Sequence, residues 1–560
     1  MTNMNQYQNI PAEKFQFAKR TDLGHDKKFD TKPVSYFQGA FRRFSKNKGA
    51  VVAAIVIAFL ILFAIFAPFF TNYTPDMYDV TYIYAAPKLP ICEKYGIPFW
   101  DGSRDRTNVG YMTYLKDMAI MQETGREVIK GGKDNVKISE DGKSYTYRYD
   151  TYYGIGFIYD EIPMSKYLDI QRYQNETGRQ VLYPVVALED RPTHSKNNTD
   201  ANIFYQVKDK KATKITPVLD EEGKLIPNYW EIPEGIDPKS WGGVAYDSLR
   251  IEGEDGFTKT VKVRDENDNL VDEERTYYYI YGVQMASTVQ VRVEYYEYYA
   301  YEHLVEEGDG VSEPLFLFGA TETGKDIFSC LAYGARFSFI FASIVAIVNF
   351  IVGVIWGSIS GYYGGKLDLA MERFCEILGS VPSMIIITLL KYHMGHFIVE
   401  QGLYKLVDIQ SALVLFIAFF ATGWIGMAGR TRMQFYRFKN QEYVLAARTL
   451  GASDARIMFK HIFPNGLGTI VTSIALVIPS MIYSETSLSY LGIINLEAGK
   501  LTSVGTLINA GQKALQQGEP YTAFVALFPC GFLVLLMLSF NLFGNGLRDA
   551  FNPSLRGSEE

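Results

Sequence analysis

The sequence has few of the residues that build metal sites, disulfide frameworks or nucleic-acid surfaces. Its four cysteines are scattered along 560 residues without the spacing of a zinc site: they are Cys92, Cys330, Cys375 and Cys530. Only Cys92 falls within the polar residues 71–313, so that part of the chain cannot hold an internal disulfide. The net charge of -7 is modest and the chain has no long basic run, which argues against nucleic-acid binding.

Side chains suited to catalysis are also scarce. Of the six histidines, His393 and His396 have an i,i+3 spacing, but no other clear metal ligand is near them in the sequence, and a surface pair is the simpler interpretation. No Ser/His/Asp or Cys/His set can be assembled within one compartment, so we predict that the chain is not an enzyme. Glu376 and Glu485 lie near the ends of apolar runs, where a carboxylate is a functional candidate, but we expect capping or packing roles.

One stretch, GATETGKD at residues 319–326, nearly matches the phosphate-binding P-loop of ATPases. The P-loop needs a Ser or Thr after its lysine to hold Mg²⁺, whereas Lys325 is followed by Asp326, whose carboxylate would face the phosphates. The stretch also precedes a predicted span on its outer side, where ATP is not supplied. We therefore reject ATP binding and expect no cofactor on this chain.

Long apolar runs divide the chain, which is too long for one compact domain. Val51–Phe70 is uncharged and, at about 20 residues, can span a bilayer. The preceding Val34–Lys48 has phenylalanines at helical spacing opposite basic residues, as in an interfacial helix. A signal peptide is the rival interpretation, but the polar tail is too long and the apolar run too extended. Five further spans are predicted: Phe337–Gly361, Ile377–Tyr392 around Pro382, Ser411–Met427, Leu467–Ser484 with a kink at Pro479, and Thr522–Phe543.

Basic residues cluster at every turn on one side of these six spans, which places both termini in the cytoplasm. The predicted fold is an all-α polytopic membrane bundle with an inserted α+β domain outside the cell. The expected parts are a cytoplasmic tail with an interfacial helix (1–48), the first transmembrane helix (49–70), the extracytoplasmic domain (71–313), a core of five transmembrane helices (314–546) and a cytoplasmic tail (547–560).

The polar residues 71–313 hold most of the 40 tyrosines and show strand-like alternation. An Asp141-Gly142 turn before Ser144–Tyr149 predicts a hairpin, and Val289–Tyr295 alternates in the same way. A weak repeat places Glu-Thr-Gly-Arg at 123–126 and again at 176–179, each time after a Tyr-Leu pair. Each copy predicts a short helix ended by glycine and followed by an extended segment. A tyrosine-rich surface suits protein or peptide binding, while tyrosines that only form strand faces are at least as good an interpretation.

The stretch 440–465, NQEYVLAARTLGASDARIMFKHIFPN, lies between two apolar runs and is predicted to face the cytoplasm. It predicts two short helices. The first is capped by Asn440 and ends near Gly451, and the second is capped by Ser453 and closed by Pro464. Each helix has an apolar face: Tyr443, Ala447 and Leu450 on the first, Met458 and Ile462 on the second. Either the bundle itself or a partner must cover these faces.

The spacing of Ala446-Ala447, Gly451 and Ile462-Phe463-Pro464 resembles the EAA loop of ABC-importer permeases. Leu445 stands where that family has glutamate, and Glu442 is the only nearby acid that could replace it. In the family this loop is the coupling helix, which docks into a groove of a separate ATP-hydrolysing subunit, and its small residues let the partner's backbone approach closely. The resemblance implies a coupling site made of Glu442, Ala446, Ala447, Gly451, Ser453 and Pro464.

Further landmarks resemble the C-type permease of oligopeptide and dipeptide importers, over residues 34–75 and 314–556. They include Ser360-Gly-Tyr-Tyr-Gly-Gly365, Glu485-Thr-Ser-Leu-Ser-Tyr-Leu-Gly492 and residues 540–549, in the same order along the chain. The resemblance implies a type I ABC-importer permease in the bacterial plasma membrane, most of all for oligopeptides. Its implied partners are a second permease, two cytoplasmic ATPases that bind ATP and Mg²⁺, and a peptide-binding lipoprotein.

Two alternatives stay open at this point. Dipeptide, nickel and glutathione importers share these motifs, and the sequence does not separate them. The chain could also be a membrane-anchored receptor or assembly protein whose outer domain is the working part.

Overall fold

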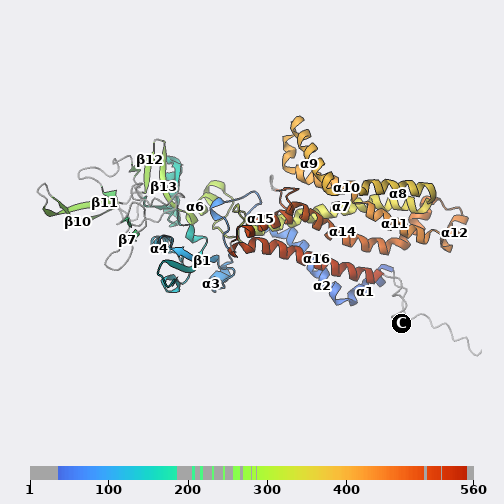
Figure 1. Ribbon diagram of the computed structural model, residues 1–560, viewed down its shortest axis with the longest axis horizontal. Coiled ribbons are helices and arrows are strands. Elements are labelled where there is room, and N and C mark those ends of the chain that lie inside the picture. Colours follow the sequence, from blue (N-terminus) through green and yellow to red (C-terminus); the bar gives the residue numbers. More distant parts are fainter. Residues whose placement is uncertain are drawn as a thin grey trace, which may run out of the picture.

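The computed structural model places a helical bundle at one end of an elongated molecule and an α+β domain at the other (Figure 1). The tail at residues 1–33 and the last residues of the C-terminal tail lie outside the described residues. The structure describes residues 36–185, 205–207, 215–217, 230–231, 244–245, 256–264, 269–278, 281–285, 287–496, 501–518 and 520–551.

The first span follows the predicted interfacial helix. Helix α1 (Tyr36–Lys46) packs on the last helix of the chain, where Phe44 meets Phe543 edge to face with the ring centroids 5.5 Å apart. Asn47 then caps helix α2 (Lys48–Phe66) by accepting a hydrogen bond from the backbone N–H of Ala50. Helix α2 is uncharged after its first residue, and its apolar side chains are largely exposed to the surroundings of the bundle, as expected of a membrane span.

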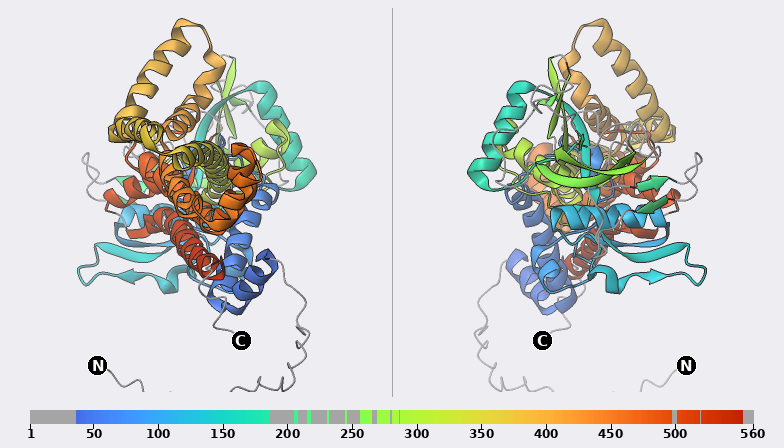
Figure 2. Two further views of the ribbon diagram at one scale, coloured as in Figure 1. Left: turned by 90° about the vertical axis from the view of Figure 1, so that its right-hand side faces the viewer. Right: turned by 90° about the vertical axis from the view of Figure 1, so that its left-hand side faces the viewer.

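Among the described residues, five helices are long and apolar enough to cross a membrane, or six if one bent pair is counted as a span. The bent pair is α8 (Gly365–Ser380) and α9 (Ser383–Glu400), which meet at 71°. The prediction of six spans therefore holds only if this pair crosses as one. The predicted span Ile377–Tyr392 is not straight, because Pro382 forces Val381 into an extended conformation and ends α8. Figure 2 shows α9 standing out from the rest of the bundle.

The other spans of the bundle are formed by long helices: α7 (Ile327–Tyr363), α10 (Gln410–Thr422) with α11 (Ile425–Phe438), α14 (Phe463–Tyr490) and α16 (Ala523–Phe551). Pro479 lies inside α14, which continues past it to Tyr490. A shorter helix, α15 (Val504–Gln516), packs beside α14 and α16.

Helices α7 and α11 approach very closely. Three glycines spaced four residues apart on α7 make this contact possible, because a Cβ atom at Gly357 would overlap the backbone carbonyl of Ala428. Gly353 and Gly361 meet α11 in the same way, one turn before and one turn after. The three glycines let α11 pack closely against α7 between Trp424 and Phe435. Helix α11 then leads directly into the stretch at 440–465.

The GATETGKD stretch forms the cap of α7. The Asp326 carboxylate accepts hydrogen bonds from the backbone N–H groups of Phe328 and Ser329. The charge that is incompatible with a P-loop therefore stabilises the N-terminus of α7. Gly324 has a positive φ of 77° and lies against the backbone of Asp79, which leaves no space for a side chain. The stretch thereby joins the start of α7 to the inserted domain.

The inserted domain is α+β, as predicted. Its main sheet is antiparallel and has the order β4 (Phe157–Pro163), β13 (Thr288–Glu294), β12 (Gly282–Met285) and β9 (Val244–Ala245), with β5 (Leu182–Tyr183) also paired to β13. A second sheet has the order β1 (Ser103–Gly110), β3 (Ser144–Asp150) and β2 (Lys137–Ile138).

The predicted hairpin is formed by β2 and β3, with Gly142 in the left-handed region of the turn. Three further strands, β10 (Gly256–Arg264), β11 (Leu270–Tyr278) and β8 (Trp230–Glu231), make a separate sheet, and β6 (Tyr205–Val207) pairs with β7 (Ile215–Pro217).

The sequence repeat corresponds to a structural repeat. Helices α4 (Tyr111–Thr124) and α5 (Met164–Thr177) follow β1 and β4, and each ends at a glycine with a φ of 70°, Gly125 or Gly178. In both copies the threonine hydroxyl donates to the carbonyl four residues earlier and accepts from the N–H of the arginine two residues later. The duplicated unit is therefore a strand, a helix and a glycine cap.

The equivalent arginines of the two copies share one acid, Glu297, which lies just after the end of β13. Arg126 pairs with Glu294, with Nε and Oε1 2.8 Å apart, and also with Glu297. Arg179 reaches Glu297 from the other copy, with Nε and Oε2 2.9 Å apart. Glu294 and Glu297 are both buried. The two copies are thus linked through the buried carboxylate of Glu297.

Tyrosine fills the core of the domain. Helix α6 (Tyr295–Tyr301) buries all five of its tyrosines. Tyr82 packs on two of them, and Tyr152 packs on Tyr82, at 1% and 0% exposure. These rings are core side chains on a helix and in loops, and they do not form a binding surface. Other tyrosines do form a strand face: Tyr147 and Tyr149 of β3 are buried in a cluster with apolar residues of α4.

The buried acid pair predicts a stability that depends on pH. The pKa of Glu294 is raised from its ordinary value of 4.5 to about 7, mainly because the carboxyl is buried; Arg126 opposes this shift and the nearby charge of Glu297 adds to it. Between these two values the folded state holds a proton that the unfolded state has lost, so stability should fall as pH rises from 4.5 to 7, by on the order of 3 kcal/mol. We expect Glu294→Gln to flatten this fall. Pulse proteolysis of the full-length protein at pH 5 and pH 8 measures it, and an unchanged pH slope in the variant would refute the assignment.

Candidate functional site

The stretch at 440–465 forms a helical elbow at the end of the bundle farthest from the inserted domain (Figure 1). Helix α11 ends at Phe438, and α12 (Glu442–Thr449) follows after a short turn. The chain then reverses into α13 (Asp454–Arg456), which continues through the π-helix η10 (Ile457–Ile462) into α14. The elbow is therefore built into the start of a long apolar helix.

The bend between the two helices is a Schellman turn. Gly451 has a φ of 81°, and its N–H donates to the carbonyl of Arg448, while the N–H of Ala452 donates to the carbonyl of Ala447. The left-handed conformation explains why glycine stands at this position. The predicted end of the first helix near Gly451 is confirmed.

Two details of the prediction are wrong. The N-cap of α12 is Gln441, one residue after the predicted Asn440, and no side chain caps the helix. Pro464 does not close the second helix, since Asp454–Tyr490 is one continuous helical segment. The π-helix that precedes Pro464 shifts the hydrogen-bond register, which accommodates a residue without an N–H. Ser453 is the N-cap of α13 as predicted, although its side chain makes no capping hydrogen bond.

The elbow is fastened to the end of α7. Asp454 accepts hydrogen bonds from the hydroxyls of Tyr362 at 2.6 Å and Tyr363 at 3.4 Å, and Arg448 donates to the Tyr362 hydroxyl at 3.3 Å. Lys439 donates to the carbonyl of Gly361 at 3.0 Å. The Ser-Gly-Tyr-Tyr-Gly-Gly stretch and the elbow are thus parts of one structure. The sequence singled out both segments, but nothing in the local pattern indicated that they touch.

An ion pair locks the helices beneath the elbow. Asp368 at the start of α8 is buried and accepts two hydrogen bonds from Arg432 on α11, at 2.6 and 2.7 Å. It also accepts from the hydroxyls of Tyr436 and Ser360. The bidentate pair joins α8 to α11, and the hydrogen bond from Ser360 joins α7 to the same carboxylate, so the three helices are held in one relative position. Nothing in the local spacing of the sequence relates Asp368 to Arg432, so this pair could not be predicted from the sequence.

The second helix packs inward, while much of the first stays open. Met458 and Ile462, which were predicted to share one face, are both buried in a cluster that includes Val444 and Phe435, so the bundle itself covers this face. On α12 the buried residue is Val444, whereas Leu450 is 87% exposed and Tyr443 is 40% exposed. The expected apolar face of α12 therefore exists, but within the described chain little of the bundle covers it.

The predicted coupling residues lie on or beside this open face. Glu442 and Ala446 are exposed on α12, and Ala447 is half-buried next to them. Gly451 and Ser453 form the bend. Pro464 is exposed at the start of α14, one segment away from α12. Small side chains at positions 446 and 447 leave the backbone of α12 accessible to a partner.

The other predicted candidates have structural roles. Glu485 is fully buried between α7 and α14 and accepts hydrogen bonds from Ser338 at 3.1 Å and Ser489 at 3.0 Å. Glu376 is exposed and pairs with Arg373. Within the described residues no third ligand joins His393 and His396, and the one group of three ligand-type side chains that could hold a metal is His303, Glu307 and Asp309 in the inserted domain.

Comparison with known proteins decides the family. Residues 353–557 match the binding-protein-dependent transport system inner membrane component, and residues 35–87 match the N-terminal transmembrane domain of oligopeptide transport permease C. The oligopeptide transport system permease protein OppC of Bacillus subtilis is 42% identical over 239 residues, which cover 43% of this chain and 72% of that protein. The chain belongs to the ABC-importer permease family.

Other relatives of the permease agree. The dipeptide transport system permease protein DppC of Bacillus subtilis is 37% identical over 239 residues, covering 43% of the permease and 69% of the relative. DppC of Lactococcus lactis is 39% identical over 258 residues, which cover 46% of the permease and 68% of that relative. The permease is thus an integral membrane transport subunit and not an enzyme. Its elbow falls inside the first matched range, whereas residues 88–352, which contain most of the inserted domain, lie between the two matches.

Proposed function

We propose that the permease imports oligopeptides as one membrane subunit of an ATP-driven complex. It would pair with a second permease, two cytoplasmic ATPases that bind ATP and Mg²⁺, and an extracytoplasmic peptide-binding lipoprotein. The names of its relatives, oligopeptide and dipeptide transport permeases, support this substrate class. Dipeptide, nickel and glutathione import remain the alternatives within the family.

The elbow carries the proposal, because one of its faces is exposed and the opposite face is bound to the helices of the bundle. Leu450 and Ala446 offer an uncovered face to a partner, while Asp454, Arg448 and Val444 tie the same element to the helices. A force applied to α12 would therefore reach α7 and α14 without loss in a flexible loop. In this mechanism, closure of the ATPases moves the elbow as a rigid lever and rocks the spans between inward-open and outward-open states.

The same mechanism requires the elbow and both termini in the cytoplasm and the inserted domain outside. The exposed basic residues around the elbow, including Arg430, Arg437, Arg456 and Lys460, support this orientation. The elbow and the inserted domain lie at opposite ends of the molecule (Figure 1), which allows one to face each side of the membrane.

Co-purification and uptake together test the function. The permease, expressed with its genomic neighbours and solubilised in mild detergent, should carry two ATPase subunits and a second permease, and cells with the complex should accumulate a labelled oligopeptide. Uptake of nickel or glutathione in place of peptide would move the substrate class within the family. A chain that purifies without any ATPase and supports no uptake would favour the receptor or assembly role.

A further inference from the structure

A cleft of about 690 Å³ opens where the inserted domain meets the membrane bundle. One wall is strand β1 of the inserted domain, and the other is the segment that leads from α15 into α16, with Tyr521 and Phe524. In Figure 1, β1 lies beside the end of the bundle at which these two helices meet. The volume is within the range of about 300–1,000 Å³ that is typical of ligand sites.

The cleft runs along a free edge of β1. Strand β1 is at the end of its sheet, with β3 on one side and no strand of the described chain on the other. The cleft is lined by five consecutive residues of the strand, 103–107. Because consecutive side chains of a strand point to opposite faces, a cleft that touches all five must follow the backbone edge. Such an edge presents N–H and C=O groups to an incoming strand.

Arg104 supplies a charge that the described chain does not neutralise. It forms no ion pair with the described residues, and its guanidinium lies over the ring of Tyr521, 4.1 Å from the centroid. The other two arginines of the cleft are already paired, Arg106 with Asp117 at 2.5 Å and Arg148 with Asp101 at 2.9 Å. Arg104 is thus the cation at this edge that is left for an anionic ligand.

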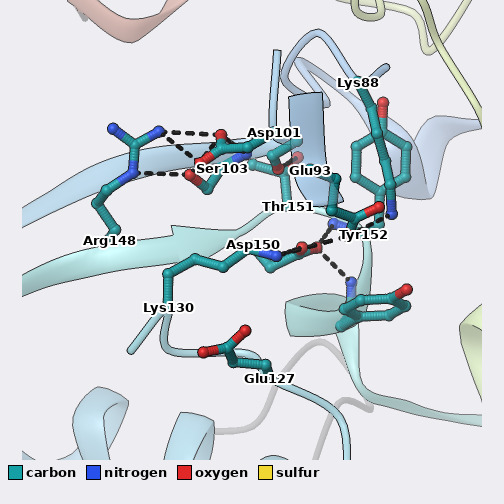
Figure 3. A network of polar contacts seen from close by, with 12 residues as sticks. Lys88, Glu93, Asp101, Ser103, Glu127, Lys130, Arg148, Asp150, Thr151 and Tyr152 are labelled. Atoms are coloured by element: carbon teal, nitrogen blue, oxygen red, sulfur yellow. Dashed lines mark hydrogen bonds and ion pairs between the residues drawn. The ribbon is translucent and has the colours of Figure 1, made fainter. Parts of the chain in front are cut away.

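The wall behind the strand is rigid. Arg148 donates to Ser103 and Asp101, and next to them Lys130 pairs with Asp150 at 2.9 Å (Figure 3). Asp150 is fully buried, and its carboxylate also accepts from the N–H of Tyr152. These contacts fix β1 and β3 before any ligand arrives.

The two walls are also fixed to each other. Trp100 donates from its indole N–H to the carbonyl of Leu317, and its ring packs on Phe528 of α16. Phe528 in turn stacks on Phe318, with the centroids 4.2 Å apart. The cleft therefore does not depend on a loose contact between two domains.

We propose that this cleft binds an extended peptide, which adds to the edge of β1 as a strand and places its C-terminal carboxylate on Arg104. Main-chain pairing would give affinity for peptides of many sequences, as a free strand edge does in other peptide-binding domains. The carboxylate would give direction. Asp105 also lines the cleft, but it follows Arg104 on a strand and so points to the opposite face.

A peptide fits these features better than a lipid headgroup, the other anion available at a membrane. A headgroup would use Arg104 but would leave the row of backbone donors and acceptors along β1 unpaired. The inference rests on the proposed function, since it takes peptides as the transported class, and it adds a binding site on the permease itself.

Binding to the purified full-length permease in phosphatidylcholine nanodiscs tests the proposal. The probes are fluorescein-labelled hexaalanine with a free carboxylate, its C-terminal amide, and a form N-methylated at every second residue, each followed by fluorescence anisotropy. The free acid should bind about tenfold more tightly than the amide, as expected for a charge-assisted hydrogen bond. Arg104→Gln should weaken the acid about tenfold and leave the amide unchanged, and N-methylation should weaken binding in both proteins. Arg104→Lys should retain part of the preference for the acid.

The matched control is Arg172→Gln, which removes an exposed arginine from α5 of the same domain and should bind like the wild type. Equal binding of acid and amide, or an equal loss of both in Arg104→Gln, would overturn the proposal. Displacement of the peptide by short-chain phosphatidylglycerol, with no effect of N-methylation, would assign the cleft to a lipid headgroup and overturn it as well. Cells that import the peptide while the purified permease does not bind it would remove this site and leave the proposed function standing. Binding of the peptide to the permease without uptake by the cells would support this site and contradict the proposed function.

Discussion

Replacing Leu450 with glutamate is expected to abolish peptide uptake while leaving the permease in the membrane. Leu450 is 87% exposed at the end of α12 and makes the largest uncovered apolar contribution to the elbow. If an ATPase groove covers it, the substitution buries an unpaired charge at that interface, at a cost of about 3–5 kcal/mol. Such a loss weakens the docking of the ATPase by more than about a hundredfold. Uptake of labelled peptide and the amount of co-purified ATPase should fall together.

The control for this prediction is Leu168→Glu. Leu168 is an exposed leucine on α5 of the inserted domain, so the same change there adds the same charge far from the elbow. It should leave both uptake and ATPase co-purification near the wild-type level. Full uptake in Leu450→Glu, with the variant inserted normally, would show that no partner covers α12 and would remove the coupling role from the elbow.

Replacing Arg292 with methionine should destabilise the inserted domain by about 3–5 kcal/mol, the range for breaking a buried ion pair. Arg292 is fully buried on β13 and donates two hydrogen bonds to Glu123 of α4, both at 2.8 Å, and one to the carbonyl of Pro184. Its guanidinium also lies 3.6 Å from the centroid of the Phe157 ring. The substitution removes the guanidinium from the poorly hydrated Glu123 carboxylate and removes the ion pair that joins β13 to α4. Pulse proteolysis of the full-length permease in urea measures the loss.

A double variant separates the ion pair from simple packing. If the broken guanidinium–carboxylate pair causes most of the loss, Arg292→Met combined with Glu123→Met should recover much of the stability, because two apolar side chains can replace a buried pair. Arg172→Met, at an exposed position on α5, should change stability by no more than about 0.5 kcal/mol. A double variant as unstable as the single one would show that the guanidinium acts through its other contacts.

Local features of the chain were predictable wherever the residues of one segment determine its conformation. The apolar runs predicted the long helices, because about 20 uncharged residues have no other stable environment than a bilayer or a core. Gly125 and Gly178 marked the ends of two helices, and Gly142 marked the turn of a hairpin, because each takes a left-handed conformation that glycine adopts without strain. The helical elbow and the position of Gly451 followed from the same kind of signal.

The failures came where a neighbouring segment decides the outcome. Pro464 is expected to end a helix, but the π-helix before it absorbs the missing hydrogen bond and the helix continues into α14. The predicted span around Pro382 consists of two helices, α8 and α9, which meet at 71°. The sequence of α6 does not show a polar face and an apolar face, because all of its residues are buried in the core.

The sequence by itself determined that this protein is a chain of membrane helices with a folded insertion, and it identified the elbow, because hydropathy, glycine positions and short motifs act over a few residues. Only the tertiary structure decided which residues meet: Tyr362 with Asp454, Asp368 with Arg432, and both Arg126 and Arg179 with Glu297. The physical reason is that an ion pair or a buried hydrogen bond depends on a distance in space, and the partners here are separated by many residues along the chain. The cleft between the edge of β1 and Tyr521 likewise exists only where the inserted domain packs on the bundle.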